Sequence, residues 1–145
     1  MQSQDQDYPI EYVDISNIHT SFGGDNEPKD PKLLELLAQA YKGEIDCRRA
    51  VVKTELIKPF SDFKPDITQE FREYFTKAFN EMKQPELYVY QAADKFIMSD
   101  DYRAYYMYKE LNSPIAICTV IGPSTITGDV DYGPSFKFRL SDSNH

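Results

Sequence analysis

One stretch, residues 95–121, restricts the fold more than any other part of this 145-residue chain. A short apolar run, Lys95–Met98, stops at residues 99–101, and a helical pattern begins directly after it. Asn112-Ser113-Pro114 ends that pattern, and the apolar run Ile115–Ile121 is typical of a buried strand. Such a junction places the first N–H groups of a helix beside the end of a strand, which is a common place for ligands.

Apolar periodicity predicts three helices in total. The first begins at Pro31 after the N-cap residue Asp30 and ends at Gly43, and the others span about 67–83 and 102–111. Strands are predicted at 8–15, 50–57, 86–90, 95–98 and 115–121, with a candidate edge strand at 136–140 and a loop at 16–29. The predicted fold class is α/β, or α+β in looser usage: a mixed sheet packed by about three helices.

The second helix carries a single apolar stripe, with phenylalanines at 71, 75 and 79. Side chains at that spacing share one face of a helix, and such an aromatic stripe belongs to a core far more often than to a cofactor site. One core is therefore predicted, made of Phe71, Phe75, Phe79, Leu87, Val89, Ile97, Ile115 and Ile117.

The length and the apolar content of 41% predict one domain spanning residues 1–145. Seven of the 24 acidic residues and one of the 16 basic residues lie in 1–30, so this part is predicted to be an acidic N-terminal arm. The rest divides into a core at 51–121 and a C-terminal extension at 122–145. Arg48-Arg49 is the most basic local sequence, and without a basic face we expect weak or no non-specific DNA binding.

The two cysteines and the N-terminal residues indicate the compartment. Residues 1–5 have no basic n-region followed by an apolar run, and no segment is long and apolar enough for a membrane span, so neither a signal peptide nor membrane association is predicted. Cys47 and Cys118 lie far apart, and Cys118 is inside an apolar run, as expected of thiols in a reducing cytoplasm. Two cysteines and two histidines in no ligand spacing predict no zinc or other metal site.

From Val51 onward, the order of elements resembles the ParB/sulfiredoxin-like superfamily. The matching pieces are Leu56-Ile57-Lys58-Pro59, the phenylalanine-striped helix, residues 85–90, Lys95–Met98, residues 99–103 and Ser113-Pro114-Ile115-Ala116-Ile117. The resemblance covers roughly residues 51–121, about half of the chain, and depends on pattern more than on identity. It implies the same fold and a nucleotide or DNA-transaction context in a bacterium, phage or plasmid.

The residues after Met98 depart from the family's pattern. In the family a glycine in this turn lets the backbone approach a phosphate, and a neighbouring basic residue contacts it. Here Asp100 and Asp101 stand where glycine is expected, while Arg103 remains. A carboxylate a few ångströms from a phosphate repels it by roughly 1–4 kcal/mol per charge pair. The catalytic cysteine of sulfiredoxins is also absent, with Tyr102 in its neighbourhood, so a non-catalytic protein is predicted.

The candidate ligand or partner site is formed by Ser99, Asp100, Asp101, Tyr102 and Arg103. Each residue type also has a structural interpretation: Ser99 as an N-cap, the aspartates as acids at the start of a helix, and Arg103 as a surface ion-pair residue. A divalent ion or a basic partner is the alternative for the aspartates. The helix also carries tyrosines that cannot all face inward, which makes them interface candidates: Tyr102, Tyr105, Tyr106 and Tyr108.

Three functions remain open from the sequence. The first is a divergent, non-catalytic ParB/sulfiredoxin-like protein that binds a nucleotide or a partner at the Ser99–Arg103 junction. The second is an acidic, tyrosine-rich protein–protein interaction module without a small-molecule site. The third is a metal-dependent nuclease that uses Asp100 and Asp101 as ligands, although adjacent helical carboxylates diverge by about 100°. No cofactor is predicted outright, a protein partner is expected, and the sequence does not indicate an oligomeric state.

Overall fold

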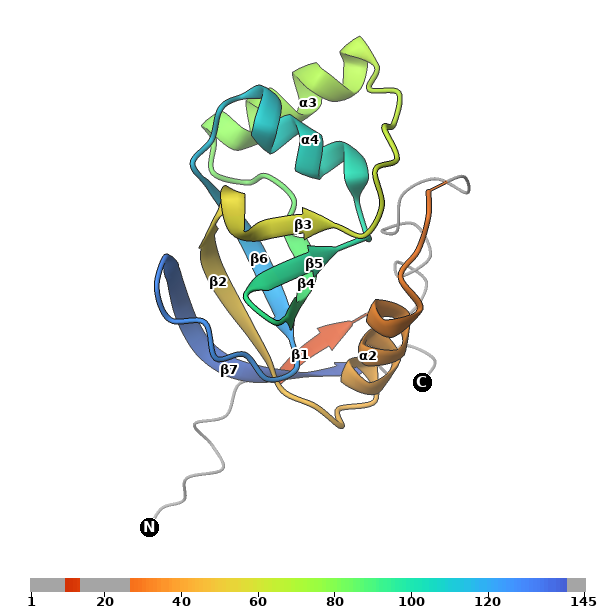
Figure 1. Ribbon diagram of the computed structural model, residues 1–145, viewed down its shortest axis with the longest axis vertical. Helices are drawn as coiled ribbons and strands as arrows, with labels where there is room; N and C mark the ends of the chain where they lie inside the picture. The colour runs from red at the N-terminus through yellow and green to blue at the C-terminus, as the bar shows by residue number, and fades with distance from the viewer. Residues whose placement is uncertain (1–9, 14–26, 141–145) are drawn as a thin grey trace.

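A mixed seven-stranded sheet forms the centre of the structure (Figure 1), a computed structural model that describes residues 10–13 and 27–140. The strands lie in the order β1-β7-β2-β6-β4-β5-β3. Their bounds are β1 Ile10–Val13, β2 Cys47–Lys53, β3 Ile57–Pro59, β4 Leu87–Ala92, β5 Lys95–Met98, β6 Ile115–Ile121 and β7 Val130–Leu140. The pairs β1–β7, β4–β6 and β3–β5 are parallel and the others antiparallel, which confirms the predicted mixed sheet.

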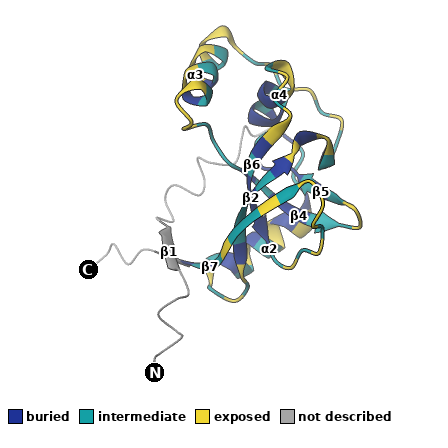
Figure 2. Cartoon of the chain, turned by 90° about the vertical axis from the view of Figure 1, so that its left-hand side faces the viewer, coloured by how far each residue is buried: buried dark blue, intermediate teal, exposed yellow. Residues whose placement is uncertain are grey.

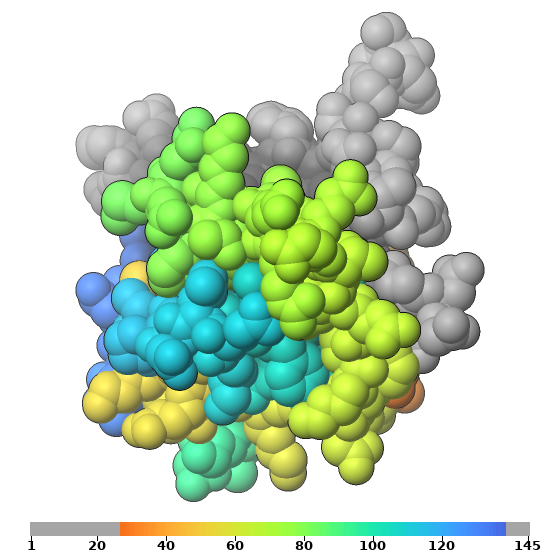
Figure 3. Space-filling model, turned by 90° about the horizontal axis from the view of Figure 1, so that it is seen from above, coloured from red at the N-terminus to blue at the C-terminus, as the bar shows by residue number. Residues whose placement is uncertain are grey.

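In the described residues, three α-helices pack on this sheet: α2 (Pro31–Tyr41), α3 (Gln69–Asn80) and α4 (Tyr102–Glu110). A short 3₁₀ turn, η2 (Thr54–Leu56), separates β2 from β3. Helices α3 and α4 lie side by side, and Figure 3 looks onto the side of the molecule that they form. Figure 2 shows α3 largely exposed and α4 more deeply buried. None of the helices in the described part of the chain is both long and apolar enough to cross a bilayer.

Two clusters of buried side chains, not one, hold the helices to the sheet. The larger joins α3 and α4 to one sheet face and contains Phe75, Leu87 and Val89, with Phe71 and Phe79 partly buried against it. The smaller joins α2 to strands β4, β6 and β7. Because successive strand residues point to opposite faces, Ile97 packs against this second cluster, where the sequence predicted a single core.

Two members of the predicted core are not in either cluster. Ile115, at the first position of β6, is 43% exposed, and Ile117 is only half-buried. Both alternate with Ala116 and Cys118, which face the α3–α4 cluster, so they point to the opposite face. Helix α2 covers that face near Ile121, at the other end of the strand. The apolar sequence of β6 does not show that α2 covers one face of the strand over only part of the strand's length.

The remaining differences from the prediction concern the ends of elements. The second helix, predicted over about 67–83, is α3 and spans Gln69–Asn80. The expected strand 50–57 is β2, which ends at Lys53, followed by η2 and the separate strand β3. The candidate edge strand 136–140 is the second half of the eleven-residue β7, whose residues 130–136 pair with β2 and whose residues 137–140 pair with β1. A register shift between Arg48 and Ala50 lets β2 follow β7 past Gly133 and Pro134.

Of the predicted acidic arm, the structure describes residues 10–13 and 27–30. Within the predicted strand 8–15, residues 10–13 form β1, which pairs with residues 137–140. The outer residues of that strand and most of the predicted loop 16–29 lie outside the described residues, as do residues 141–145 of the C-terminal extension.

The hairpin between β4 and β5 turns through two residues, Ala93 and Asp94, and Ala93 has a φ of 58°. A side chain in this left-handed conformation costs about 1 kcal/mol, and glycine avoids the cost. We therefore expect Ala93→Gly to raise the free energy of unfolding by about 0.5–1 kcal/mol in urea denaturation. Ala92→Gly, one residue earlier and inside β4, is the control and should lower it by a similar amount. A loss of stability in Ala93→Gly would show that this turn is not strained.

Candidate functional site at the start of helix α4

The predicted site lies where β5 ends at Met98 and α4 begins at Tyr102. Ser99 and Asp100 are 2% and 6% exposed, so the junction is an interior part of the fold. A segment far away in the sequence, residues 27–30, packs against it, with Glu27 and Asp30 also buried. We call these four residues the 27–30 strap.

Three hydrogen bonds attach the 27–30 strap to the junction and to β4. The Asp30 amide donates to Ser99 Oγ at 3.1 Å. The Tyr102 hydroxyl, which is 3.2 Å from Ser61 Oγ, donates to the Pro28 carbonyl oxygen at 2.9 Å. The Tyr90 hydroxyl donates to Asp30 Oδ2. The side chains of Ser99 and Tyr102 are therefore already occupied by the chain's own backbone.

Asp30 begins α2, as the sequence predicted. Its Oδ1 accepts a hydrogen bond from the Lys32 amide at 2.9 Å, and Pro31 occupies the first turn. Because the second carboxylate oxygen accepts from Tyr90, this cap also ties the helix to β4. Burial, with Asp30 adding to it, raises the pKa of Tyr90, so its hydroxyl keeps its proton and remains a donor.

The N-cap of α4 is Asp101, and the prediction of Ser99 in that role is wrong. Asp101 Oδ1 accepts from the Ala104 amide at 3.0 Å, which is the bond that an N-cap side chain makes. Ser99 lies two residues too early, and its hydroxyl accepts from Asp30. Serine and aspartate cap helices about equally well, so local sequence does not distinguish them.

Asp100 is the most deeply buried acid of the junction. Its Oδ2 accepts from the Tyr88 amide at 3.2 Å, while Oδ1 has no hydrogen-bond partner among the described residues. Burial raises the pKa of Asp100 well above its ordinary value, and the nearby Asp101 raises it further. The structure thus favours the protonated form of this carboxyl group.

Glu27 and Asp101 form a second pair of carboxyl groups at the junction. Burial, followed by the charge of Asp101, raises the pKa of Glu27 although Lys29 and Arg103 oppose the shift. Burial also raises the pKa of Asp101 against the opposing effects of the Ala104 amide and Arg103. Glu27 Oε1 is buried without a hydrogen-bond partner in the described part of the chain. The nearby cations therefore do not fully compensate these carboxylates.

Arg103 points toward α3. Its guanidinium carbon lies 4.3 Å from the centre of the Phe71 ring, in a cation–π contact. Its Nε is buried and has no hydrogen-bond partner among the residues that the structure describes. The one arginine of the predicted site is thus stacked on a ring of the larger cluster, and its Nε–H has no acceptor in the described part of the chain.

Three of the four tyrosines proposed as interface residues are buried: Tyr102, Tyr105 and Tyr108. Helix α4 packs against both α3 and the sheet, so it has more than one covered side. Tyr106 is half-buried, with Lys64 Nζ 4.8 Å from its ring centre. As the sequence required, the tyrosines do not all face inward, and Tyr106 is the one whose ring a partner could contact.

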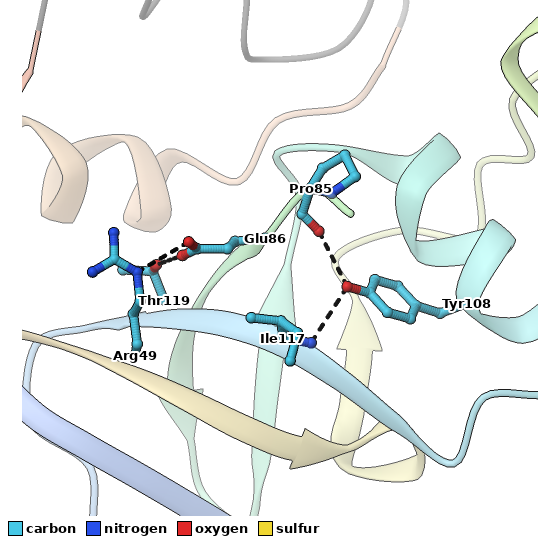
Figure 4. A network of polar contacts seen from close by, with 6 residues as sticks. All are labelled: Arg49, Pro85, Glu86, Tyr108, Ile117 and Thr119. Atoms are coloured by element: carbon cyan, nitrogen blue, oxygen red, sulfur yellow. Dashed lines mark hydrogen bonds and ion pairs between the residues drawn. The ribbon is translucent and has the colours of Figure 1, made fainter. Parts of the chain in front are cut away.

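Tyr108 belongs to a polar network on the other side of α4, drawn in Figure 4. Its hydroxyl donates to the Pro85 carbonyl at 3.1 Å and accepts from the Ile117 amide at 3.4 Å. Next to Pro85, Glu86 accepts from Thr119 and forms an ion pair with Arg49 at 3.0 Å. These contacts connect β2, β6 and the start of β4, which is a structural role that the sequence did not indicate.

The described residues do not place three metal-ligating side chains together, at the junction or elsewhere. A groove of about 660 Å³ runs along the outer, polar face of α3, between Gln69 and Glu81, and is not part of the junction. The sequence missed Glu27, Asp30, Ser61 and Tyr90 as parts of the site. Asp30 was recognisable as a cap, whereas nothing local shows that it contacts a serine 69 positions later.

Comparisons with known proteins find similarity of structure only. No family model matches the chain, and no curated protein sequence does. The structure is similar to sulfiredoxin from Arabidopsis thaliana, with a TM-score of 0.46 and 12% identity over 52% of this chain and 85% of that chain. It is also similar to a C-terminally truncated chromosome-partitioning protein ParB from Caulobacter crescentus complexed with CTP-gamma-S, with a TM-score of 0.41 and 11% identity over 52% of this chain and 45% of that chain. Both likenesses are distant and concern the fold alone.

Proposed function

We propose that this chain is a non-catalytic binding protein that recognises a basic group of a protein partner at the start of α4. The observation that carries the proposal is the set of buried carboxyl groups there, two of which, on Glu27 and Asp100, have an oxygen without a hydrogen-bond partner in the described chain. Buried acceptors without partners are costly, and a donor supplied by a ligand would remove that cost.

The charge of the junction argues against a phosphate ligand. A phosphate would meet the carboxyl groups of Glu27, Asp100 and Asp101, and the one arginine of the predicted site is stacked on Phe71. Ser99 Oγ, which could donate to a phosphate, is covered by the 27–30 strap, whose Asp30 amide donates to it. A nucleotide would therefore have to remove the strap and lie against carboxyl groups that repel it whenever they are ionised, with no glycine to let the backbone approach it.

A guanidinium or ammonium group has the complementary chemistry. It provides several N–H donors, and its charge favours the ionised form of each neighbouring carboxyl group, so binding would release protons. The net charge of −8 would also attract a basic partner at long range. Tyr106 lies one turn along α4 from Tyr102 and offers an aromatic ring beside the site.

Binding of a hexa-arginine peptide, measured by isothermal titration calorimetry, tests the proposal. We expect Asp101→Asn to weaken binding by about 1–3 kcal/mol, because the amide keeps the N-cap but loses the charge. Glu73→Gln, which removes the same charge from the exposed face of α3, is the matched control and should change little. If both variants lost the same binding free energy, the peptide would be held by non-specific charge attraction and not by the junction.

The same assay separates this function from the nucleotide and DNA alternatives. Nucleoside triphosphates with Mg²⁺ should leave the thermal midpoint unchanged, and duplex DNA should not bind measurably at physiological salt. A clear nucleotide shift that disappears in Arg103→Ala and grows in Asp101→Gly would overturn the proposal and establish a phosphate site.

A further inference from the structure

One part of the attachment of the 27–30 strap consists of hydrogen bonds whose donors do not lose their protons at ordinary pH. The donors of its three hydrogen bonds are the Asp30 amide and the hydroxyls of Tyr90 and Tyr102. Burial raises the pKa of both tyrosines, so these donors keep their protons at ordinary pH. These bonds hold the strap against three separate parts of the fold: β4, α4 and the junction itself.

A second part of the attachment depends on pH. Closing the strap buries the Glu27 carboxyl group, which is 7% exposed, beside Asp101. The charged groups that face Glu27 are Asp101, Lys29 and Arg103, and Tyr102 also faces it, with its backbone N–H opposing the rise in the pKa of Glu27. Asp101 in turn faces Arg103 from its own helix and Asp100 from the junction. When Glu27 and Asp101 are both ionised, closure buries two negative charges side by side, and Lys29 and Arg103 compensate them only in part, since Glu27 Oε1 has no hydrogen-bond partner among the described residues.

We propose that the 27–30 strap is a proton-sensitive cover: it closes over the junction when the Glu27–Asp101 pair is protonated and opens when the pair ionises. This inference concerns the free protein and does not depend on the proposed function.

The direction of the pH effect follows from the closed state. Because the pKa of Glu27 is higher in the closed strap than in water, the closed state binds the proton more tightly than the open state does. Closure is therefore fully favoured below the ordinary carboxyl range, near pH 4–5, and is progressively lost as the pH rises through the raised value. Opening would uncover Ser99 Oγ, the Tyr102 hydroxyl and the carboxyl groups of the junction.

Hydrogen–deuterium exchange of the Asp30 amide measures closure directly, because this amide donates to Ser99 only when the strap is closed. After correction for the intrinsic exchange rate, we expect its protection in the wild-type protein to fall by about tenfold or more between pH 5 and pH 8. Glu27→Gln keeps the shape of the side chain without its charge, so protection should be high and flat over this range. Glu35→Gln, on the exposed face of α2, is the matched control and should keep the wild-type profile.

Two further variants make the test decisive. Asp101→Asn, which retains the N-cap, should also flatten the profile. Tyr102→Phe should lower protection at every pH without changing the slope, because it removes the bond to Pro28 and leaves the carboxyl pair in place. Protection that is constant or rises with pH in the wild-type protein, or a Glu27→Gln profile with the wild-type slope, would overturn the proposal.

Discussion

Phe75→Ala is expected to lower the free energy of unfolding by about 3–5 kcal/mol, the largest loss that we predict for a single side chain. The ring is fully buried in the larger cluster. It contacts Tyr108 edge-on at 5.3 Å between centroids and stacks on Phe79 at 6.4 Å, so its removal leaves a cavity between α3 and α4. Urea denaturation followed by circular dichroism measures the loss.

The neighbouring residue provides the control. Tyr74 belongs to the same helix but is 56% exposed, and Tyr74→Ala should change stability by less than about 1 kcal/mol. Both substitutions change helix propensity by a similar amount. The difference between their stability losses therefore measures the contribution of the buried ring of Phe75. If Phe75→Ala cost less than about 1 kcal/mol, α3 would not pack on the sheet in the way described.

Asp100→Asn is expected to stabilise the protein at neutral pH, by about 1–3 kcal/mol. The wild-type carboxyl group is buried, and burial raises its pKa, so its contribution to stability is fully present below the ordinary carboxyl range and is lost as the pH rises through the raised pKa. An amide keeps an acceptor for the Tyr88 N–H and does not ionise. The difference in the free energy of unfolding between Asp100→Asn and the wild-type protein should therefore grow as the pH rises and vanish in acid.

Thermal and urea unfolding at a series of pH values tests this expectation. Asp62→Asn, at an exposed position, is the matched control and should shift stability by less than about 0.5 kcal/mol at any pH. Destabilisation by Asp100→Asn at pH 7 would contradict the expectation, since it would mean that the ionised carboxylate is satisfied in the folded protein.

The elements with strong local boundaries could be predicted from the sequence. Asp30 and Pro31 define the start of α2, and Asn112-Ser113-Pro114 ends α4, so both helices agree with prediction to within a residue or two. The apolar run of β6 matches its strand at both ends. In each case the determining interactions lie within a few residues of one another.

Features that depend on distant parts of the chain could not be predicted. Ile97 and Ile115 look like core residues in the sequence, but their environment depends on which sheet face α2 covers and how far it extends. The second half of β7 pairs with β1, which lies more than a hundred residues earlier in the sequence. Likewise, the contact between Asp30 and Ser99 that covers the candidate site leaves no local pattern.

The strand order has a consequence for synthesis on the ribosome. The first three strands to emerge, β1, β2 and β3, never pair with one another; their neighbours are β7, β6 and β5. No part of the sheet can therefore form until β5 has been made, and β1 must wait for residues 137–140. The nascent chain therefore carries unpaired strands through most of translation. Long-range strand pairing is slow, and a chain whose strands remain unpaired is prone to aggregation and is a typical substrate of chaperones.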